Sequence, residues 1–247
     1  MQVVILAGGL GSRLSEETQK IPKPLVTIAG VPIIFRIMSH FLNYSHDEFL
    51  ILGGYKCEMI TEYFQKKFDK INETNTEGLC DLQLRHGTDN FRVKILNSGL
   101  NTSTGGRIKF AEKLLSDRFF LTYGDGLSDV NLDHLELFAS QQDTIATVTA
   151  VRPPARFGSL ELTESLVSDF SEKNPQKEGW INGGYFVCKK NICNVMRNDV
   201  EEVLEKHTMP ELVNKSELSA FRHEGFWHPM DTMRDKLILE ELFQKES

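Results

Sequence analysis

The sequence contains few cysteines, and their spacing suits no metal site. Only four occur among 247 residues, none of them belongs to a Cys-x-x-Cys pair, and none has a histidine at ligand spacing beside it: Cys57, Cys80, Cys188 and Cys193. Structural zinc sites need four Cys or His ligands in short, regular spacings. The pattern therefore argues against a zinc site. It favours reduced, mostly buried thiols of the kind that cytoplasmic proteins contain.

Long hydrophobic runs and a basic leader are both missing. The chain opens with Met-Gln-Val-Val-Ile-Leu, which carries no positive charge, and no apolar run approaches the ~20 residues that a helix needs to cross a bilayer. We therefore expect a cytoplasmic protein with no membrane partner.

Positive charge is neither abundant nor concentrated. Lys and Arg number 28 against 35 Asp and Glu, which gives a formal charge of −7, and the basic residues are scattered along the chain. A nucleic-acid-binding surface needs a basic stripe that neutralises phosphates, so we expect no nucleic-acid partner. An anionic substrate must then be held by a local group of cations. The length is sufficient for one α/β domain that buries its core without disulfides.

Hydrophobic patterning predicts alternating strands and helices in the first 150 residues, which is typical of parallel α/β sheets. The first strand is a β-branched apolar run that stops at Gly8-Gly9. In order, we expect a strand at 3–7, a helix at 33–42, a strand at 49–52, a helix at 59–68, strand-like pieces around 82–84 and 93–95, a helix at 104–114, a strand at 118–123, a helix at 132–141 and a strand at 144–151.

The hydrophobic pattern changes after Pro153-Pro154 and predicts short strands separated by polar turns. This pattern fits a mixed extension better than continued βαβ winding. There we expect strands at 159–162, 167–170 and 181–187, helices near 200–204 and 209–213, and a last helix around 237–243. The predicted fold class is α/β: a Rossmann-like, mostly parallel sheet flanked by helices, with a small mixed β extension. One domain is expected over 1–247, divided into a first part of about 1–150 and an extension of about 151–247.

A glycine-rich loop follows the first strand and carries the clearest chemical signal. It reads Leu-Ala-Gly-Gly-Leu-Gly-Ser-Arg-Leu over 6–14, and Ile-Pro-Lys-Pro-Leu follows at 21–25. Glycines let backbone N–H groups approach an anion, and Arg13 and Lys23 can supply positive charge to phosphate oxygens. The loop lacks the last glycine of a Rossmann G-x-G-x-x-G motif and the G-K-[ST] of a Walker loop. A phosphate cradle is the interpretation that we favour over a tight turn with solvated charges.

The loop together with Pro22-Lys23-Pro24 resembles the signature of the nucleoside triphosphate-dependent sugar-1-phosphate nucleotidyltransferases. Further segments are similar, in order along the chain, to those of the glucose-1-phosphate cytidylyltransferases, and they extend from about residue 1 to residue 243. These segments are Leu-Ser-Glu-Glu-Thr at 14–18, Thr-Gly-Gly-Arg at 104–107, Thr-Tyr-Gly-Asp-Gly at 122–126, Arg-Phe-Gly at 156–158, Ser-Glu-Lys at 171–173, Ile-Asn-Gly-Gly-Tyr-Phe at 181–186 and Gly-Phe-Trp-His-Pro-Met-Asp-Thr at 225–232.

The resemblance implies a role for individual positions of this sequence. Arg13 and Lys23 would act as the catalytic cations on the phosphates, and Asp125 and Asp231 would coordinate Mg²⁺. The nucleotide would be bound by Leu6, Ala7, Gly8, Gly9, Gly11, Ser12, Thr104, Gly105, Arg107 and Gly124, with Arg107 as an additional cation near a nucleotide or acceptor phosphate. The acceptor would be bound by Glu172, Lys173, Trp180, Asn182 and Gly183.

Several of these residues also fit simpler roles. Asp125 lies between two glycines, where an aspartate commonly forms a turn with its own backbone. Asp231 precedes the last expected helix and could cap it. Glu172 and Lys173 could form an ordinary exposed turn pair. Each alternative stays open at the level of the sequence.

The implied reaction is the Mg²⁺-dependent transfer of CMP from CTP to a phosphorylated acceptor, with release of pyrophosphate. Glucose 1-phosphate, which would give CDP-glucose, is the first acceptor that the resemblance implies, and a homo-oligomer is the expected assembly. Two departures from the family pattern, Asn174 and Trp180, lie beside the expected acceptor pocket. A different acceptor is therefore the alternative: another sugar phosphate, or a phosphorylated amino acid such as phosphoglutamine, used in surface-polysaccharide synthesis. Alternatives of another class are a non-catalytic nucleotide-sugar sensor and, less favoured, a dinucleotide-binding oxidoreductase.

Overall fold

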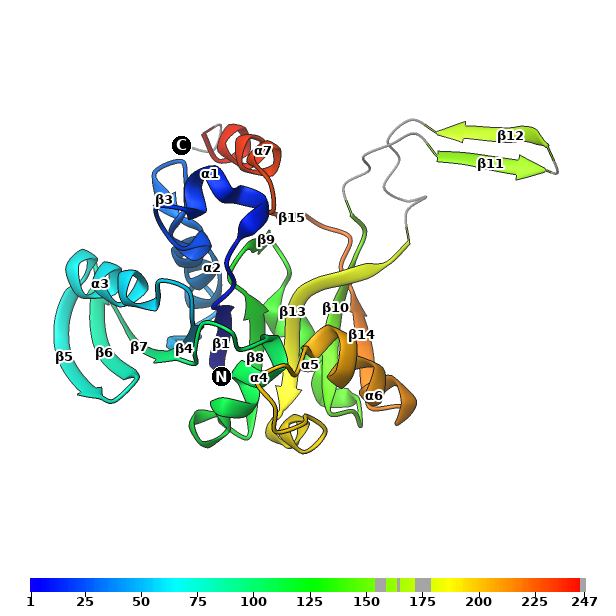
Figure 1. Ribbon diagram of the computed structural model, residues 1–247. Coiled ribbons are helices and arrows are strands. Elements are labelled where there is room, and N and C mark those ends of the chain that lie inside the picture. Colours follow the sequence, from blue (N-terminus) through cyan, green and yellow to red (C-terminus); the bar gives the residue numbers. More distant parts are fainter. Residues whose placement is uncertain (154–158, 164, 172–178, 245–247) are drawn as a thin grey trace.

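A nine-stranded mixed sheet forms the centre of the molecule (Figure 1). The computed structural model describes residues 1–153, 159–163, 165–171 and 179–244. Across the sheet, the strands are β14 (Leu218–Arg222), β10 (Ala146–Val151), β13 (Ile181–Lys189), β8 (Arg118–Tyr123), β1 (Gln2–Ala7), β4 (Glu48–Gly53), β7 (Asp89–Asn97), β6 (Leu79–His86) and β5 (Asp69–Thr76).

The middle of the sheet is parallel, and its margins contain antiparallel pairs. Strands β8, β1, β4 and β7 run parallel to one another, as do β10 and β14, whereas β13 is antiparallel to both of its neighbours. Every residue of β1 is buried. A parallel strand that is covered on both faces has no solvent side, which explains why its sequence is a continuous apolar run.

Helices cover both faces of the sheet. On one face, Val3 and Ile5 of β1 pack into a cluster with residues of α2 (Ile33–Leu42), α3 (Cys57–Lys67), α5 (Leu132–Gln141) and α7 (Met233–Gln244). On the other face, Val4 and Leu6 pack with residues of α4 (Thr104–Phe110) and α6 (Met209–Asn214). The alternation of β1 side chains thus joins two separate cores through one strand.

The remaining short elements surround the carboxyl edge of the parallel strands. Strand β9 (Gly126–Ser128) follows β8 directly and pairs with β15 (Trp227–Pro229). The other short elements are α1 (Ser15–Thr18), β2 (Thr27–Ile28) and β3 (Val31–Pro32). Because β9 and β15 pair, the segments that follow β8 and precede α7 meet at one place. In the described part of the chain, no helix is long and apolar enough to span a membrane.

The predicted α/β class is confirmed, and two differences concern the second half of the chain. The predicted mixed extension corresponds to the hairpin of β11 (Ser159–Thr163) and β12 (Leu166–Ser171), which lies away from the main sheet in Figure 1. In contrast, β13 and β14 return to the main sheet, so the sheet crosses the expected division near residue 150. The helix predicted near 200–204 is wrong: a turn leads there into a π-helical turn at Leu204–Thr208.

Candidate active site

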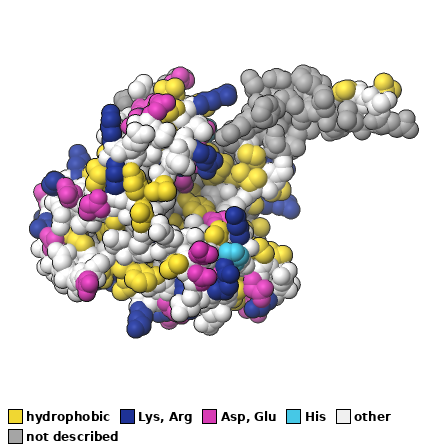
Figure 2. Space-filling view, in the orientation of Figure 1, with side chains coloured by type: hydrophobic (Ala, Val, Ile, Leu, Met, Phe, Trp, Pro, Cys, Tyr) yellow, Lys and Arg dark blue, Asp and Glu magenta, His cyan; other side chains and the backbone are white. Residues whose placement is uncertain are grey.

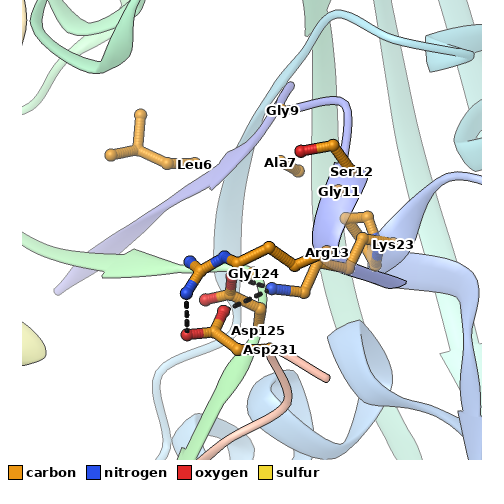
Figure 3. Close-up of a pocket in the computed structure, with 11 residues that line it drawn as sticks. Leu6, Ala7, Gly9, Gly11, Ser12, Arg13, Lys23, Gly124, Asp125 and Asp231 are labelled. Carbon is orange, nitrogen blue, oxygen red and sulfur yellow. Dashed lines mark hydrogen bonds and ion pairs between the residues drawn. The ribbon is translucent and has the colours of Figure 1, made fainter. Parts of the chain in front are cut away.

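A pocket of about 220 Å³ opens at the carboxyl end of β1 and β8 (Figure 3). Ligands of open α/β sheets bind at this edge. The volume is below the ~300–1,000 Å³ of a typical complete ligand site, so it suits one part of a larger ligand. Ten of the predicted site residues line it together with Pro24: Leu6, Ala7, Gly9, Gly11, Ser12, Arg13, Lys23, Gly124, Asp125 and Asp231.

Lys23 lies between two carboxylates at the floor of this pocket. Its Nζ atom donates to Asp125 Oδ2 at 2.6 Å and to Asp231 Oδ1 at 2.9 Å, and Arg13 Nη1 lies 3.1 Å from Asp231 Oδ2 (Figure 3). The Lys23 side chain is only 11% exposed, whereas that of Arg13 is 72% exposed. The two cations are therefore different in kind: one is fixed in the floor, and the other is free to turn toward a ligand in the mouth.

The electrostatics of Lys23 are set by its two acidic neighbours. Burial alone would lower the pKa of its ammonium group, but the charges and hydrogen bonds of Asp125 and Asp231 outweigh burial and raise the pKa. Lys23 is therefore charged at neutral pH. The four side chains carry two positive and two negative charges, so the pocket floor is neutral before any ligand arrives.

The geometry decides between two roles for Asp231. The N-terminus of α7 is capped by Thr232 and Asp235: Asp235 Oδ2 accepts from the Thr232 amide at 2.9 Å, and Thr232 Oγ1 accepts from the Asp235 amide at 3.2 Å. This is the reciprocal arrangement of a capping box. The cap belongs to Thr232, and the Asp231 carboxylate is directed instead to Lys23 and Arg13.

Gly11 shapes the loop that forms the rim of the pocket. Its φ of 65° lies in the left-handed region, and a Cβ atom there would lie 2.8 Å from Thr18 Cγ2 and 3.2 Å from Lys23 Cβ. Thr18 Oγ1 donates to the Gly11 carbonyl at 3.0 Å and fixes the turn. The short 3₁₀ turn Ser12–Leu14 begins here, and it carries Arg13 over the pocket.

The structure places Arg107 behind the loop, whereas the sequence predicted a cation near a phosphate. Only 4% of the residue is exposed, and its guanidinium donates to the Ser98 hydroxyl and to four backbone carbonyls, including those of Gly8 at 3.0 Å and Gly53 at 2.7 Å. Gly8 packs directly on this guanidinium, since a Cβ there would lie 2.1 Å from Arg107 Cζ. The Arg107 guanidinium thus donates its hydrogen bonds to backbone carbonyls, and the residue holds the glycine loop in position.

Thr104 and Gly105 likewise lie outside the pocket lining. Thr104 Oγ1 donates to Glu205 Oε2 at 2.8 Å and accepts from the Leu204 amide at 2.9 Å. A Cβ on Gly105 would lie 2.7 Å from Glu202 Cγ, so the glycine allows α4 to pack against the segment before the π-helical turn. The described contacts of this block support the site from behind, and its direct contact with a nucleotide stays a prediction.

On the acceptor side, the structure describes three of the five predicted residues. Glu172 and Lys173 lie outside the described residues, as does Asn174. The Asn182 side chain accepts from the Gly184 amide at 2.8 Å and donates to Tyr123 Oη at 3.3 Å, and the Gly183 carbonyl accepts from Trp227 Nε1 at 2.7 Å. Trp180 is half-buried and lies immediately before β13. These contacts join β8, β13 and β15 beside Asp125.

Sequence reasoning missed Tyr123 and Glu205. The Tyr123 hydroxyl donates to Glu205 and accepts from Asn182. Burial, followed by the nearby Glu205 carboxylate, raises the pKa of Tyr123 far above its ordinary value, so the phenol stays protonated. The sequence did offer one indication that Tyr123 lies near the site: it stands at the end of a strand, two residues before Asp125.

The donor set at the pocket floor suits a magnesium ion. Asp125 and Asp231 approach the same Lys23 nitrogen, so their oxygens are close enough to share one cation. Mg²⁺ usually binds one or two carboxylates together with substrate phosphates and waters. No group of three or more His, Cys, Asp or Glu side chains in the described ranges could hold a metal ion. A metal at these two carboxylates would therefore take its remaining oxygen ligands from substrate phosphates and water.

A profile of the nucleotidyl transferase family matches residues 2–232 of the chain. The chain belongs to this family and is a nucleotidyltransferase. Within the family, it is 39% identical to the glucose-1-phosphate cytidylyltransferase of Salmonella typhimurium, over 99% of this chain and 96% of that protein. It is 36% identical to a probable glucose-1-phosphate cytidylyltransferase of Bacillus subtilis, over 99% and 97%.

A solved structure agrees with the fold. The crystal structure of HddC from Yersinia pseudotuberculosis in complex with GMP-PN matches with a TM-score of 0.70 at 24% identity, covering 98% of this chain and 99% of that chain. At this identity the match shows the fold alone.

Proposed function

We propose that the protein transfers CMP from CTP to a phosphorylated small molecule and releases pyrophosphate, with glucose 1-phosphate as the first acceptor to test. The observation that carries the proposal is the convergence of Arg13, Lys23, Asp125 and Asp231 in one pocket at the end of β1 and β8. The identity of 39% to a glucose-1-phosphate cytidylyltransferase supports the choice of CTP and of the acceptor.

The chain's own residues offset the repulsion between two anionic substrates. An oxygen of the acceptor phosphate attacks the α-phosphorus of CTP, a new P–O bond forms, and the bond to the pyrophosphate group breaks. No general base is needed, because a phosphate oxygen is already a nucleophile at neutral pH. Lys23 is fixed in the floor to contact the phosphate at the reaction centre, and Arg13 can follow the leaving pyrophosphate from the rim. Positioning and electrostatic stabilisation dominate reactions of this type.

Mg²⁺ is the cofactor of the proposed reaction, and Asp125 and Asp231 would hold it. When bound, the ion would neutralise phosphate charge and orient the triphosphate. Since Lys23 contacts both carboxylates, an arriving ion would compete with its ammonium group for them. Lys23 would then have its positive charge available for a phosphate.

Pyrophosphate release from each nucleoside triphosphate in the presence of glucose 1-phosphate and Mg²⁺ tests the proposal. We expect release with CTP and at least tenfold less with UTP, dTTP or GTP at equal concentration. Release with UTP or dTTP in place of CTP would show the cytidine assignment to be wrong. Turnover by itself would separate an enzyme from a nucleotide-sugar sensor, and the family membership already supports the enzyme.

A different acceptor is the second candidate, and a specific observation favours it. Trp180 contributes a large ring beside Asn182, where the resemblance led us to expect a smaller aliphatic side chain. Another sugar phosphate or a phosphorylated amino acid, as used in surface-polysaccharide synthesis, is therefore part of the acceptor panel. The proposal also includes a homo-oligomer, which light scattering coupled to size-exclusion chromatography measures.

A further inference from the structure

Four side chains beside the pocket form one continuous set of hydrogen bonds. The Glu205 carboxylate, on the π-helical turn, accepts from the Tyr123 hydroxyl through Oε1 and from the Thr104 hydroxyl through Oε2. The Tyr123 oxygen in turn accepts from the Asn182 amide at 3.3 Å. These contacts join the end of β8, the start of β13 and the start of α4. We call Glu205, Tyr123, Thr104 and Asn182 the Glu205 network.

The direction of each hydrogen bond around Asn182 is fixed by a backbone amide. The Gly184 N–H group can only donate, so the group that it meets at 2.8 Å must be the Asn182 carbonyl oxygen. The NH₂ group of Asn182 therefore faces Tyr123 and donates to its oxygen. The Tyr123 hydroxyl hydrogen is then directed to Glu205.

The hydroxyl of Thr104 is directed to Glu205 for a similar reason. Its oxygen accepts from the Leu204 amide at 2.9 Å, and its own hydrogen is donated to Glu205 at 2.8 Å. Two hydroxyl donors thus converge on one side chain. A carboxylate accepts from both, whereas the amide of a glutamine has a single oxygen and can accept from only one of them.

The network leaves one donor of Asn182 unused. An amide NH₂ group carries two hydrogens, of which one is donated to Tyr123. Among the residues that the structure describes, the second hydrogen has no partner. Asn182 is only half-buried, so a ligand can reach it. Because Gly184 and Tyr123 hold the amide from two sides, the direction of the unused N–H group is fixed.

The unused donor lies near the groups that carry the proposed reaction. Tyr123 is followed directly by Gly124 and Asp125, which both line the pocket. Burial is the largest cause of the raised pKa of Tyr123, and the negative charges of Glu205 and Asp125 add to it. The phenol is therefore within electrostatic reach of the Asp125 carboxylate. An acceptor whose phosphate lies at Asp125 would have Asn182 beside it.

We propose that Glu205 is a positioning residue for the acceptor: it fixes the Tyr123 hydroxyl and, through it, the Asn182 amide, which donates its second N–H group to an oxygen of the acceptor. This inference rests on the proposed cytidylyl transfer and adds a residue to its acceptor site. Glu205 itself does not contact the acceptor. The phosphate and the hydroxyl groups of a sugar phosphate both offer oxygens to such a donor.

Steady-state pyrophosphate release from CTP, Mg²⁺ and glucose 1-phosphate tests the inference. Glu205→Gln keeps the size of the side chain and removes one of its two acceptor oxygens. We expect the KM for glucose 1-phosphate to rise about tenfold, which corresponds to the loss of one hydrogen bond, while the KM for CTP changes less than twofold. Tyr123→Phe removes the link between Glu205 and Asn182 and should have the same effect.

A double variant shows whether Glu205 acts through Tyr123. Once Tyr123 is replaced by Phe, Glu205→Gln should raise the KM for glucose 1-phosphate no further, because the link is already absent. Glu201→Gln is the matched control: Glu201 is an exposed glutamate four residues earlier, and its side chain makes no hydrogen bond to the four residues of the network. It should leave both KM values unchanged. Thermal unfolding confirms that each variant is folded.

Three results would overturn the inference. One is an unchanged KM for glucose 1-phosphate in Glu205→Gln, which would leave Glu205 a structural role only. Another is additivity of the two substitutions, and the third is a rise in the KM for CTP in place of that for the acceptor. Absence of pyrophosphate release from CTP with every acceptor, in the wild type, would instead contradict the proposed function, and the inference that rests on it would fall as well.

Discussion

At the scale of single residues, the pocket depends on acids that neutralise a buried lysine. Replacing Asp125 by Asn removes one negative charge beside Lys23 and one oxygen anion from the proposed metal site, while the volume stays the same. We expect turnover to fall by about 100-fold or more, the range seen when one preorganised electrostatic contact is lost. Steady-state pyrophosphate release measures this effect.

The control for this substitution is Asp143→Asn, because Asp143 is fully exposed and is not among the residues that line the pocket. Its turnover should equal that of the wild type. The Asp125→Asn protein should stay folded at the assay temperature, with a somewhat lower Tm because Lys23 loses one of its two counter-charges. Undiminished turnover in Asp125→Asn would remove Asp125 from the metal site and leave it only the turn role that the sequence also allowed.

Two neighbouring glycines of the loop should respond differently to the same added methyl group. In Gly8→Ala the new Cβ would meet the Arg107 guanidinium, which cannot withdraw without leaving the carbonyls of Gly8 and Gly53. Overpacking of this kind costs about 1–3 kcal/mol of unfolding free energy. At Gly9 no atom lies within 4 Å of the added Cβ, so Gly9→Ala should change stability by less than about 0.5 kcal/mol.

Urea unfolding of the two alanine variants measures the difference. Gly8→Ala should also raise the KM for CTP, because displacement of Arg107 releases the loop that rims the pocket. Equal stability of the two variants would show that Arg107 is easily displaced, and the supporting role that we assign to it would be wrong.

At the scale of elements, an ion pair joins two antiparallel strands at the margin of the sheet. Arg92 of β7 donates to Asp81 of β6 from Nε at 2.8 Å and from Nη2 at 2.6 Å. These hydrogen bonds lower the pKa of Asp81. The unfolded chain, in which Asp81 has its ordinary pKa of about 3.9, therefore takes up the proton first as the pH falls. The stabilisation is complete above that pH and is lost as the pH falls through the folded-state pKa.

Asp81→Asn should accordingly lower the unfolding free energy by about 1 kcal/mol at pH 7, a value reduced by the partial exposure of Arg92. The difference from the wild type should shrink near pH 3. Urea titrations at both pH values measure it. Glu62→Gln is the control, since its pair with Lys66 is exposed and should contribute less than about 0.5 kcal/mol. A difference that is the same at both pH values would contradict the assignment to this ion pair.

Helices and strands could be predicted from the sequence where burial leaves either a continuous apolar run or apolar residues at regular spacing. Strand β1 and helix α2 bury whole runs or one regular face, and both were predicted within one residue. Strand β5 was missed because it is a polar, almost entirely exposed edge strand, which has no alternation to detect. The π-helical turn at Leu204–Thr208 is held by contacts with Thr104 and Tyr123, which are distant in sequence.

The candidate site likewise contains parts that the sequence predicts and parts that it does not. The loop, Lys23 and both aspartates could be predicted, because their motifs are local. Their meeting in space depends on the pairing of β9 with β15, which no local pattern shows. Arg107 was placed wrongly for a related reason: its residue type suggests a phosphate, but its acceptors include the carbonyl of Gly53 at the end of β4 and those of Gly8 and Gly99 just after β1 and β7. Satisfaction of buried carbonyls is a tertiary property.

At the scale of the whole molecule, a negative net charge is compatible with anionic substrates because the charges at the pocket are balanced locally. Basic side chains are spread over the visible face among acidic ones (Figure 2), and the net charge is −7. At the pocket floor, Lys23 and Arg13 are matched by Asp125 and Asp231. A neutral floor gives a triphosphate little attraction by itself. An added divalent cation would change the balance to positive, so nucleotide and metal should bind together.

This coupling predicts a ligand effect on global stability. CTP with Mg²⁺ at about 100 times its Kd should stabilise the protein by about 2.7 kcal/mol, which corresponds to roughly 5–10 °C in Tm for a chain of this size. CTP with a chelator should give only a small part of this shift, because the pocket floor stays neutral and attracts the triphosphate weakly. Mg²⁺ alone should also give only a small part, because it adds positive charge that no phosphate balances. Differential scanning calorimetry of wild type and Asp125→Asn measures the coupling. A full shift with CTP in the presence of a chelator would mean that Arg13 and Lys23 suffice for the triphosphate, and that the two aspartates serve mainly to hold Lys23 in the floor.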